Sequence, residues 1–446
     1  MKKTDVAVIG GSAAGLTAAI TARRHYPEKE VLLIRKEKQV LIPCGIPYIF
    51  GTVGSPDKNL IPDAPLSKNG IELLLDEATE LDRDKREVRT AGGDVVSYDR
   101  LVLATGSLPA MPPIPGFELR NVFPIYKDVA HLQGMQEALR DVSDLVIIGG
   151  GFIGVEFADE CKKSLKAKVS IIEMLPHCLM LAYDEEFCAE AERLLKERGI
   201  APMTDTKVER LTGDGSVEAV QLAGGESLPA QAAIIGIGAS ANVNLAKNAG
   251  LPVGPTGGVV VDRTMRTPDA AVFACGDCAE KVSFFGGRPS PLKLASIATE
   301  EARIAGANLY GTRRENIGTV GVWSTIIGDT AFATAGLTET LAARHGYQYI
   351  TGSAEAVNRH PGGMPGAQPM KVKLVFEKRT GVILGGQVMG DRAAGEVINA
   401  ISACIQNRMT AEDIAMFQTG TQPALTASPI AYQFVNAAEA AIAALR

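Results

Sequence analysis

Cys44 is the residue in this sequence best suited to redox chemistry. It lies in residues 42–48, which read IPCGIPY. Proline is tolerated in the first turn of a helix, so Pro47 predicts a helix that begins near Gly45 and leaves Cys44 close to its N-cap. The partial positive charge at such a position lowers the pKa of a thiol and favours the thiolate, the form that attacks a disulfide. The alternative is a buried, unreactive cysteine.

Two glycine-rich turns have the composition of dinucleotide-binding sites. The first covers residues 10–15 (GGSAAG) and the second residues 149–154 (GGGFIG). Small residues there let a pyrophosphate approach the N–H groups at a helix N-terminus. Ser12 replaces the middle glycine of GxGxxG in the first turn, so a tight packing turn is the alternative there, whereas the second turn keeps all three glycines. The candidate dinucleotide contacts are Gly10, Ser12, Ala13, Ala14, Gly15, Gly149, Gly151, Phe152, Ile153 and Gly154.

Glu173 indicates which nicotinamide cofactor the second turn accepts. It stands nineteen positions after Gly154, at the end of a second apolar run. A carboxylate there hydrogen-bonds the ribose 2′-hydroxyl of NADH and repels the 2′-phosphate of NADPH. We therefore expect NADH rather than NADPH, with a solvated surface glutamate as the alternative.

Each glycine turn needs a strand before it and a helix after it, and the sequence contains both. Apolar residues 6–9 and 31–34 flank a helical stretch over 14–24. The same pattern returns over residues 145–172. Each set predicts a βαβ unit, and two such units predict two dinucleotide-binding domains in one chain.

The rest of the chain predicts how these domains are connected. Segments rich in proline or glycine at 109–116 and 250–258 bracket the second βαβ unit, so the second domain is expected to be inserted into the first. After about residue 311 the sequence becomes rich in Val and Thr, with predicted strands at 370–376 and 382–388 and a final alanine-rich helix over 428–446. This part is typical of an α+β interface domain.

Composition excludes several classes of function. The chain has 446 residues, enough for about three domains, and 46% of them are hydrophobic. Its 45 Lys+Arg and 51 Asp+Glu give a formal charge of −6 without a basic block, so no nucleic-acid partner is expected. No signal peptide, membrane span or metal site is expected either. Seven irregularly spaced cysteines favour a reducing cytoplasm.

Two further segments resemble those that complete a flavin site in flavoproteins with two dinucleotide domains. They are residues 103–109 (LATGSLP) and residues 272–277 (VFACGD). The resemblance implies that Asp277 binds the ribityl chain of FAD and that Thr105 and Gly106 lie near the junction with the NAD domain. Four motifs in this order predict a flavoprotein that uses FAD and NAD(P)H. Cys275 and Cys278 form a C-x-x-C pair around Asp277, but flavin binding is the favoured role of that turn.

Across the whole chain the sequence resembles the pyridine nucleotide-disulfide oxidoreductase family. The resemblance rests on the two glycine turns, Cys44-Gly45-Ile46-Pro47-Tyr48, Ala104-Thr105-Gly106 and Cys275-Gly276-Asp277. It is strongest to a single-cysteine branch of coenzyme A-disulfide reductases, NADH oxidases, NADH peroxidases and sulfur or polysulfide reductases. In the dithiol reductases a second cysteine follows five residues after the first, but that position is Ile49 here.

The resemblance implies an α/β fold with two Rossmann-like domains and a C-terminal α+β dimerisation domain. The expected domains are FAD-binding at 1–115 and 245–315, NAD-binding at 116–244, and dimerisation at 316–446. The implied enzyme is a homodimer in which NADH reduces FAD and FAD reduces Cys44. The expected substrates are low-molecular-weight disulfides, persulfides or polysulfides, with coenzyme A disulfide or persulfide favoured. An NADH oxidase or peroxidase is the second hypothesis, and a flavin-bearing NADH sensor or electron-transfer partner is the third.

The resemblance also implies ligand contacts outside the glycine turns, and this chain departs from the family at several of them. The remaining expected cofactor contacts are Arg35, Lys36, Ala78, Ala104, Thr105, Gly106, Asp277 and Gly238. The expected substrate contacts are Arg23 or Arg24 for coenzyme A phosphates, together with His360 and Gln422. The alternatives are solvated arginines and a loop histidine without a ligand. Arg35 stands where an acidic residue normally holds the FAD ribose, so another group must make that contact. Gln422 stands where the dithiol reductases carry a histidine, and an amide cannot shuttle a proton.

Overall fold

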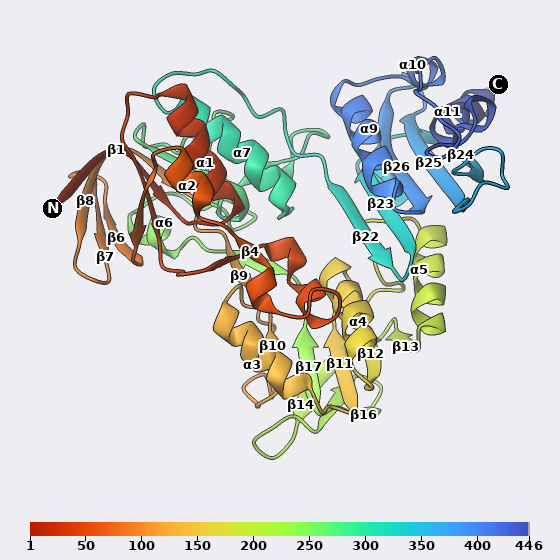
Figure 1. Cartoon of the computed structure of the whole chain (residues 1–446), viewed down its shortest axis with the longest axis horizontal. Coiled ribbons are helices and arrows are strands. Elements are labelled where there is room, and N and C mark those ends of the chain that lie inside the picture. The colour runs from red at the N-terminus through yellow and green to blue at the C-terminus, as the bar shows by residue number, and fades with distance from the viewer. Residues whose placement is uncertain (445–446) are drawn as a thin grey trace. The chain divides into compact units, whose positions relative to one another are not determined.

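The computed structural model describes residues 1–444, which form two compact units (Figure 1). Unit 1 contains residues 1–113, 123–141 and 237–319. Unit 2 contains residues 114–122, 142–236 and the chain from residue 320 onward. Within the described residues, none of the helices is long and apolar enough to cross a membrane.

Unit 1 is built on a sheet whose strand order is β5-β2-β1-β8-β7-β6. Strand β19 also pairs with β8, along the edge of β8 opposite to β1. The parallel strands of the sheet are β1 (Lys2–Ile9), β2 (Val31–Arg35), β5 (Glu72–Leu75), β8 (Val95–Leu103) and β19 (Val272–Ala274). Two antiparallel strands, β6 (Ala78–Asp82) and β7 (Glu87–Thr90), extend the sheet from β8. Because β19 follows the residues of the second glycine turn in sequence, the chain returns to the first sheet after building the second.

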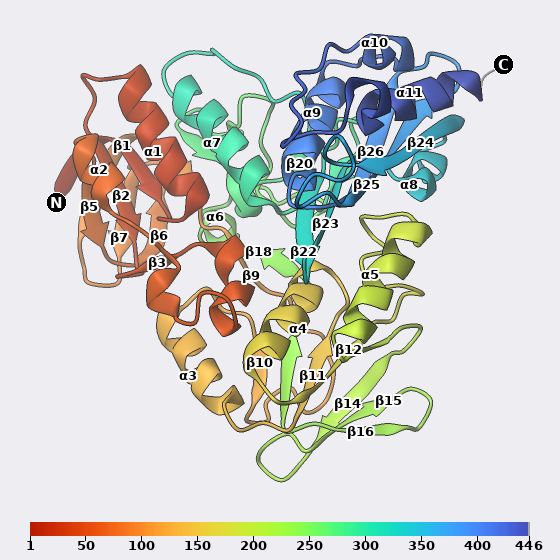
Figure 2. The same cartoon turned by 45° about the vertical axis from the view of Figure 1, so that its right-hand side comes forward.

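Helix α1 (Ala13–His25) completes the first βαβ unit and packs against α7 (Ala295–Asn308), as Figures 1 and 2 show. Small side chains permit this approach: a Cβ on Gly306 would lie 2.7 Å from the carbonyl oxygen of Ala18. Ala18 and Ala22 are fully buried. The predicted strand-helix-strand pattern over residues 6–34 is therefore confirmed.

Unit 1 also contains several shorter elements. A small hairpin pairs β3 (Val40–Leu41) with β4 (Leu60–Ile61), and α2 (Ala64–Lys68) follows. The unit also holds α3 (Val129–Leu139), the strand pair β9 (Ser107–Pro109) and β18 (Ala239–Ala241), and the pair β20 (Lys281–Val282) and β21 (Pro289–Ser290).

Unit 2 contains the second βαβ unit in a sheet of order β10-β17-β11-β12-β13. The second unit consists of β11 (Asp144–Ile148), α4 (Phe152–Ser164) and β12 (Lys168–Ile172), as predicted. The sheet is completed by β10 (Val122–Pro124), β13 (Ile200–Met203) and β17 (Ala232–Ile235), and α5 (Glu185–Glu197) precedes β13. A three-stranded antiparallel sheet contains β14 (Val208–Thr212), β15 (Ala219–Leu222) and β16 (Ser227–Pro229).

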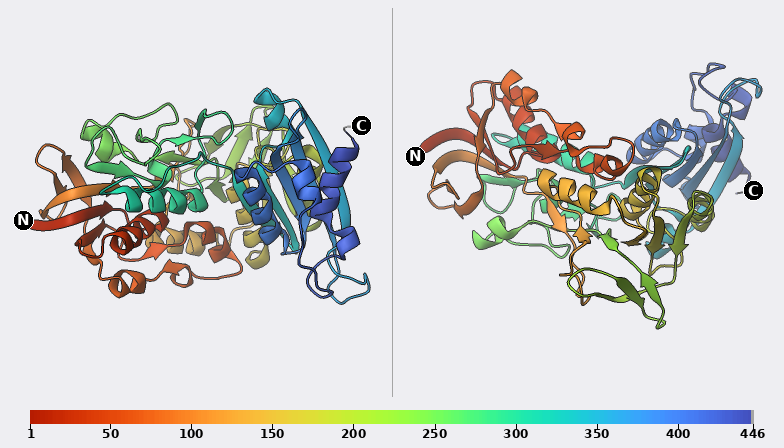
Figure 3. Two further views of the ribbon diagram at one scale, coloured as in Figure 1. Left: turned by 90° about the horizontal axis from the view of Figure 1, so that it is seen from above. Right: turned by 60° about the horizontal axis from the view of Figure 1, so that its bottom comes forward.

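The C-terminal part of unit 2 is an antiparallel sheet with helices packed on it, which confirms the predicted α+β texture (blue in Figure 3). The strands run in the order β22 (Val322–Ile327), β23 (Thr330–Gly336), β26 (Ile383–Gly390), β25 (Pro369–Glu377) and β24 (Tyr349–Val357). Helix α9 (Ala394–Gln406) packs on β23 and β26, and α11 (Gln433–Ala443) packs on β24 and β25. Short helices α8 (Glu339–Arg344) and α10 (Ala411–Ala415) lie in the connections.

Two predicted boundaries differ from the structure. The final helix begins at Gln433 rather than at residue 428, because Tyr432 is extended and a 3-10 turn occupies Pro429–Ala431. Its predicted last residues, 445–446, lie outside the described residues. The chain leaves unit 2 at Gly236 rather than in residues 250–258, where the glycines make a tight turn with Gly254 N bonded to Gly258 O. The three-domain division with its boundaries stays a prediction.

Candidate active site

The carboxyl ends of the parallel strands in unit 1 lie along one edge of the sheet. Ala104 N donates to Ile9 O at 2.8 Å and Cys275 N donates to Leu103 O at 3.0 Å, so β1, β8 and β19 end in register. The segments that follow these strands carry the predicted FAD residues. In an open α/β sheet ligands bind outside this edge, where the direction of strand order reverses. The fold therefore brings the predicted FAD motifs together.

The first glycine turn fits the pyrophosphate of a dinucleotide. Gly10 has a φ of +111°, in the region that favours glycine, and a Cβ there would collide with the carbonyl oxygen of Ala104. A Cβ on Gly15 would collide with the carbonyl oxygen of Gly10, so α1 begins directly on the turn. Ser12 is the N-cap residue, makes no capping bond with its side chain, and no acidic residue stands in the first turn of α1. The helix end thus keeps its positive polarity for an anion.

Asp277 lies at the same edge, after β19. Its Oδ2 accepts a hydrogen bond of 2.7 Å from Ser107 Oγ and lies 3.6 Å from Lys127 Nζ. Thr105 Oγ1 donates to the carbonyl oxygen of Asn242 at 2.6 Å, which ties the two chain segments of unit 1 together there. A half-buried carboxylate with spare acceptor capacity suits the hydroxyls of a ribityl chain. Asp277 therefore fits its predicted role.

A buried ion pair supports the turn that presents Asp277. The side chains of Lys281 and Glu301 are only 2% and 1% exposed, and Lys281 Nζ lies 3.4 Å from Glu301 Oε2. Gly276 N donates to Glu301 Oε2 at 2.8 Å, and Gly276 O accepts from Lys281 Nζ at 2.6 Å. Burial raises the pKa of Glu301 to about 7, although Lys281 and the Gly276 N–H oppose the rise. These two residues were not found from sequence, because Lys281 and Glu301 stand in segments without a motif.

Cys44 is exposed but does not stand at the start of an α-helix, so that part of the prediction was wrong. The segment forms two 3-10 turns, Pro43–Gly45 and Pro47–Phe50. Gly45 N bonds to Ile42 O and Ile46 N bonds to Pro43 O, which are contacts of the i to i+3 kind. Pro47 is the first residue of the second turn, a position where its missing N–H costs no hydrogen bond, and the helix that it begins is of the 3-10 kind. Cys44 lies within the first turn rather than at its N-cap.

Asn59 holds the Cys44 turn in place and was not identified from sequence. Asn59 Nδ2 donates to Ile42 O at 2.9 Å, and Ile42 N donates to Asn59 O at 2.9 Å. A Cβ on Gly45 would collide with Asn59 Oδ1, so glycine is required beside the cysteine. Ile49, at the position of the missing second cysteine, is fully buried. Its side chain therefore belongs to the core that supports the turn.

The second glycine turn keeps the geometry of the first and adds a direct bond from Glu173. Gly149 has a φ of +108°, and a Cβ on Gly154 would collide with the carbonyl oxygen of Gly149. The carboxylate of Glu173 accepts from Gly150 N at 2.7 Å and from Leu175 N at 2.8 Å. Each carboxylate oxygen can accept a second bond, so a ribose hydroxyl remains a possible donor to it. Glu173 thus lies against the glycine turn that the sequence predicted it to serve.

The first residue of α4 packs on the one tryptophan of the chain. The rings of Phe152 and Trp323 stack with centroids 6.0 Å apart and planes at 10°. One turn later on α4, Glu156 Oε1 accepts from Thr325 Oγ1 at 3.0 Å, and burial raises the pKa of Glu156 to about 7. The beginning of the second glycine-turn helix is therefore packed against β22 within unit 2.

The comparisons with known proteins place this chain in a family. Residues 4–302 match the family described as pyridine nucleotide-disulphide oxidoreductase, and residues 322–429 match the dimerisation domain of that family. The chain belongs to this family. Like its members, it is an oxidoreductase of mixed α/β fold that uses FAD and NADH.

Three relatives span nearly all of this family member. A NAD(P)H coenzyme A polysulfide/persulfide reductase of Pyrococcus horikoshii is 33% identical over 395 residues, 87% of this chain and 88% of the relative. An NADH oxidase of Methanocaldococcus jannaschii is 30% identical over 426 residues, 92% of each chain. The solved structure of a NAD-dependent persulfide reductase from A. fulgidus is 31% identical with a TM-score of 0.91, and the match covers 98% of this chain and 83% of that one.

The predicted substrate residues of this pyridine nucleotide-disulphide oxidoreductase lie in two places. Arg23 donates to the carbonyl oxygens of Pro27, Lys29 and Asn69, so its guanidinium is used in packing, whereas Arg24 is exposed. His360 Nδ1 lies 2.9 Å from Thr426 O, in the turn that starts at Gln422. The exposed Gln422 accepts from Ala424 N with its side chain. Within unit 2 the structure thus brings His360 and Gln422 together, and of the two arginines only Arg24 is available to a phosphate.

The remaining predicted cofactor residues have ordinary structural partners. Lys36 Nζ pairs with Glu77 Oε1 at 3.1 Å, and Ala78 begins β6 with a partly buried side chain. Gly238 has a φ of +107° and accepts from Ala110 N at 3.0 Å. Their contacts with cofactors stay predictions, as do those of the glycine turns.

Proposed function

We propose that this enzyme uses NADH to reduce a low-molecular-weight disulfide, persulfide or polysulfide, with Cys44 as its nucleophile. The observation that carries the proposal is the contrast in burial among the seven cysteines. Cys44 is exposed, and the other six, all within the described residues, are buried. Burial raises the pKa of thiols such as Cys275 and Cys278, which keeps them protonated and unreactive. None of the seven forms a disulfide in the structure.

The reaction follows from thiolate chemistry. The Cys44 thiolate attacks one sulfur of the substrate R–S–S–R′, forms a mixed disulfide Cys44–S–S–R, and releases R′S⁻. FAD, when bound, relays the two electrons of NADH to this disulfide. Cleavage of the S–S bond then returns the Cys44 thiolate and releases RS⁻. With Ile49 at the place of a second cysteine, no intramolecular disulfide competes with the mixed disulfide.

Coenzyme A persulfide or disulfide is the substrate that we favour. The reductases of Pyrococcus horikoshii and A. fulgidus are named for persulfide reduction, and the former also for coenzyme A. Arg24 is an exposed cation near the end of α1, within the same unit as Cys44, and could bind a phosphate of coenzyme A. A reactive thiol of this kind also needs a reducing compartment, which favours the cytoplasm.

Anaerobic stopped-flow turnover of NADH tests the proposal. Coenzyme A disulfide, coenzyme A persulfide, polysulfide and hydrogen peroxide are compared as acceptors with the wild type, Cys44→Ser and Cys404→Ala. We expect rapid reduction of a sulfur substrate, a loss of more than ~1000-fold in Cys44→Ser, and little change in Cys404→Ala, which removes a buried thiol of α9. Reduction of sulfur substrates by Cys44→Ser at the wild-type rate would refute the proposal.

An NADH oxidase is the second candidate, favoured by the relative of that name in Methanocaldococcus jannaschii. In that case oxygen is the acceptor, and Cys44 could pass through a sulfenic acid. Oxygen consumption with NADH alone, measured beside sulfur reduction, separates the two. Oxygen turnover that equals or exceeds sulfur turnover would place the oxidase first.

We further propose a homodimer in which the loop with His360 and Gln422 reaches the Cys44 site of the partner subunit. The match of residues 322–429 to a dimerisation domain supports the dimer. Subunit mixing tests the shared site: Cys44→Ser is unfolded and refolded together with a variant in which His360 and Gln422 are both Ala. Recovery of activity in the mixture, from two inactive parents, is expected because one site of each heterodimer is intact. No recovery from verified heterodimers would refute the shared site.

A further inference from the structure

Arg35 occupies, in the first βαβ unit, the place that Glu173 occupies in the second. Each residue follows or ends the second strand of its unit, and each lies against the second residue of its glycine turn. A Cβ on Gly150 would lie 2.9 Å from Glu173 Cβ and 3.1 Å from Glu173 Cγ. A Cβ on Gly11 would lie 3.2 Å from Arg35 Cβ and Cγ and would collide with Arg35 Cδ. The first unit therefore has a cation where an acid would hold a ribose.

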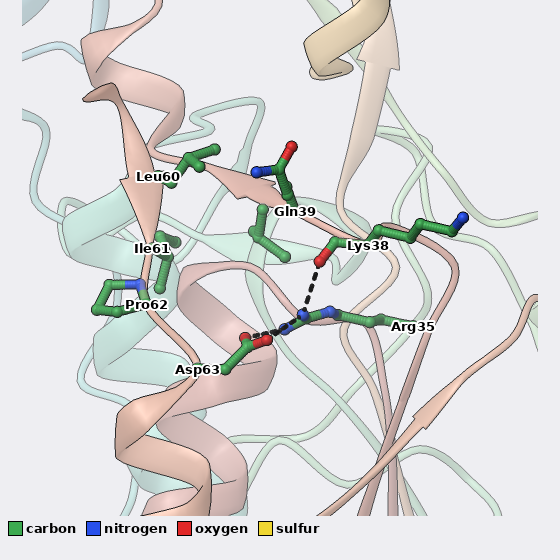
Figure 4. Close-up of a pocket in the computed structure, with 8 residues that line it drawn as sticks. Arg35, Lys38, Gln39, Leu60, Ile61, Pro62 and Asp63 are labelled. Atoms are coloured by element: carbon green, nitrogen blue, oxygen red, sulfur yellow. Dashed lines mark hydrogen bonds and ion pairs between the residues drawn. The ribbon is translucent and has the colours of Figure 1, made fainter. Parts of the chain in front are cut away.

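The guanidinium of Arg35 is committed to protein partners (Figure 4). Its Nη1 donates to Asp63 Oδ1 at 2.6 Å and its Nη2 to Asp63 Oδ2 at 2.8 Å, which is a bidentate pair. Its Nε donates to Glu37 O at 2.8 Å, and its side chain is only 3% exposed. A phosphate would have to displace these hydrogen bonds, so Arg35 is unsuited to binding a phosphate. Its geometry serves to hold Asp63.

Asp63 is held with its carboxylate open to a ligand. Its side chain is 50% exposed, in contrast to that of Arg35. Although Asp63 is the N-cap residue of α2, its side chain makes no capping bond, so both oxygens are directed to Arg35. Each oxygen accepts one hydrogen bond there and can accept another. Asp63 and Arg35 line a cavity of about 290 Å³ together with residues 38–40 and 60–62 (Figure 4).

We propose that Asp63, positioned by Arg35, binds the 2′-hydroxyl of the adenosine ribose of FAD. The carboxylate that most dinucleotide sites carry at the end of the second strand is here supplied from a segment 28 residues further along the chain. Because Arg35 neutralises the carboxylate, the pyrophosphate at the nearby glycine turn meets a neutral ion pair rather than a lone negative charge. Arg35 is a positioning residue, and Asp63 is the ligand.

FAD binding to the apoprotein tests this inference independently of turnover. The dissociation constants of FAD and of its 2′-deoxyadenosine analogue are measured by flavin fluorescence for the wild type, Asp63→Asn and Asp57→Asn. Asp57 is an exposed carboxylate of the neighbouring turn and serves as the matched control. Asp63→Asn is expected to weaken FAD binding by roughly 10- to 100-fold, the effect of losing a hydrogen bond to a charged acceptor, and to bind the analogue no worse than the wild type does.

Binding of FAD and its 2′-deoxy analogue to the wild-type apoprotein is by itself a test of the inference. If the wild type binds FAD and the 2′-deoxy analogue equally well, no carboxylate contacts the 2′-hydroxyl and the inference is overturned, whether or not Asp63→Asn folds. If Asp63→Asn weakens FAD and the analogue by the same factor, the pair is only a structural tie between β2 and α2, which also overturns it. A selective loss for FAD supports it.

Discussion

The buried Glu301 should make the stability of this enzyme depend on pH in a direction that the structure fixes. Burial raises its pKa from 4.5 to about 7 in the folded protein, and its Oε1 atom has no hydrogen-bond partner among the described residues. Below pH 4.5 the group is protonated in both states. Between 4.5 and about 7 the unfolded chain loses the proton while the folded protein keeps it, so the free energy of unfolding falls as pH rises.

The size of the effect follows from the same pKa values. A rise from 4.5 to about 7 corresponds to about 3 kcal/mol of unfolding free energy, which is lost across that window. Lys281, Cys275 and Glu300 are the titratable neighbours that act on or are affected by Glu301. Glu301→Gln removes the titrating group and leaves Lys281 bonded to the carbonyl oxygens of Gly276 and Ala279. The free energy of unfolding of the variant should therefore lack the fall with pH that Glu301 causes in the wild type.

Thermal melts of the wild type and Glu301→Gln between pH 5 and 8 measure the difference. We expect the melting temperature of the wild type to fall relative to the variant by roughly 5–10 °C across this range. Glu28→Gln, at an exposed position of the same unit, should show no relative change. In the infrared spectrum, the wild type should have a protonated carboxyl band near neutral pH that Glu301→Gln lacks. A constant difference in melting temperature across the range would refute the reasoning.

Three further predictions concern other contacts. Glu173→Gln should lower the preference for NADH over NADPH by roughly 10-fold or more, since the charge that repels a 2′-phosphate is lost; KM values for both cofactors check this. Asn59→Ala should destabilise the Cys44 turn by about 1–3 kcal/mol and speed amide hydrogen exchange over residues 42–46. Lys373→Met should lower the unfolding free energy of unit 2 by ~3–5 kcal/mol in urea melts, because the carboxylates of Asp184 and Glu339, 3.0 and 2.7 Å from Lys373 Nζ, lose this counter-charge.

The fold was largely predictable because its signals are local. A buried strand, a glycine turn and a helix follow one another within about thirty residues, so each βαβ unit could be identified from consecutive residues. The exposed thiol was also predictable, but the α-helix expected after it was not formed. Pro47 does begin a helical turn, as expected, but that turn is of the 3-10 kind and Cys44 lies in a separate turn before it. Asn59, whose contact with Ile42 the sequence did not reveal, holds the first of these turns.

The parts of the site that escaped prediction join residues distant in sequence. Arg35 and Asp63 are 28 positions apart, and Lys281 and Glu301 meet at Gly276, in the turn of Asp277, where each side chain forms a hydrogen bond with the backbone. Neither pair has a spacing that distinguishes it from ordinary surface charges. These pairs can be recognised only in the folded protein, because a charged side chain needs a partner once it is buried and the sequence does not show which charges are buried.

The two glycine turns differ in how many backbone N–H groups they leave for a cofactor, and this difference bears on how long each cofactor stays bound. In the second turn the N–H of Gly150 is already bonded to Glu173, so one of its amides is occupied by protein. In the first turn the carboxylate is moved to Asp63, and no side chain among the described residues accepts a hydrogen bond from Gly11 N–H. That turn can offer one more amide to a pyrophosphate. We therefore expect tight retention of FAD at the first turn and faster exchange of NADH at the second, as a prosthetic group and a hydride donor require.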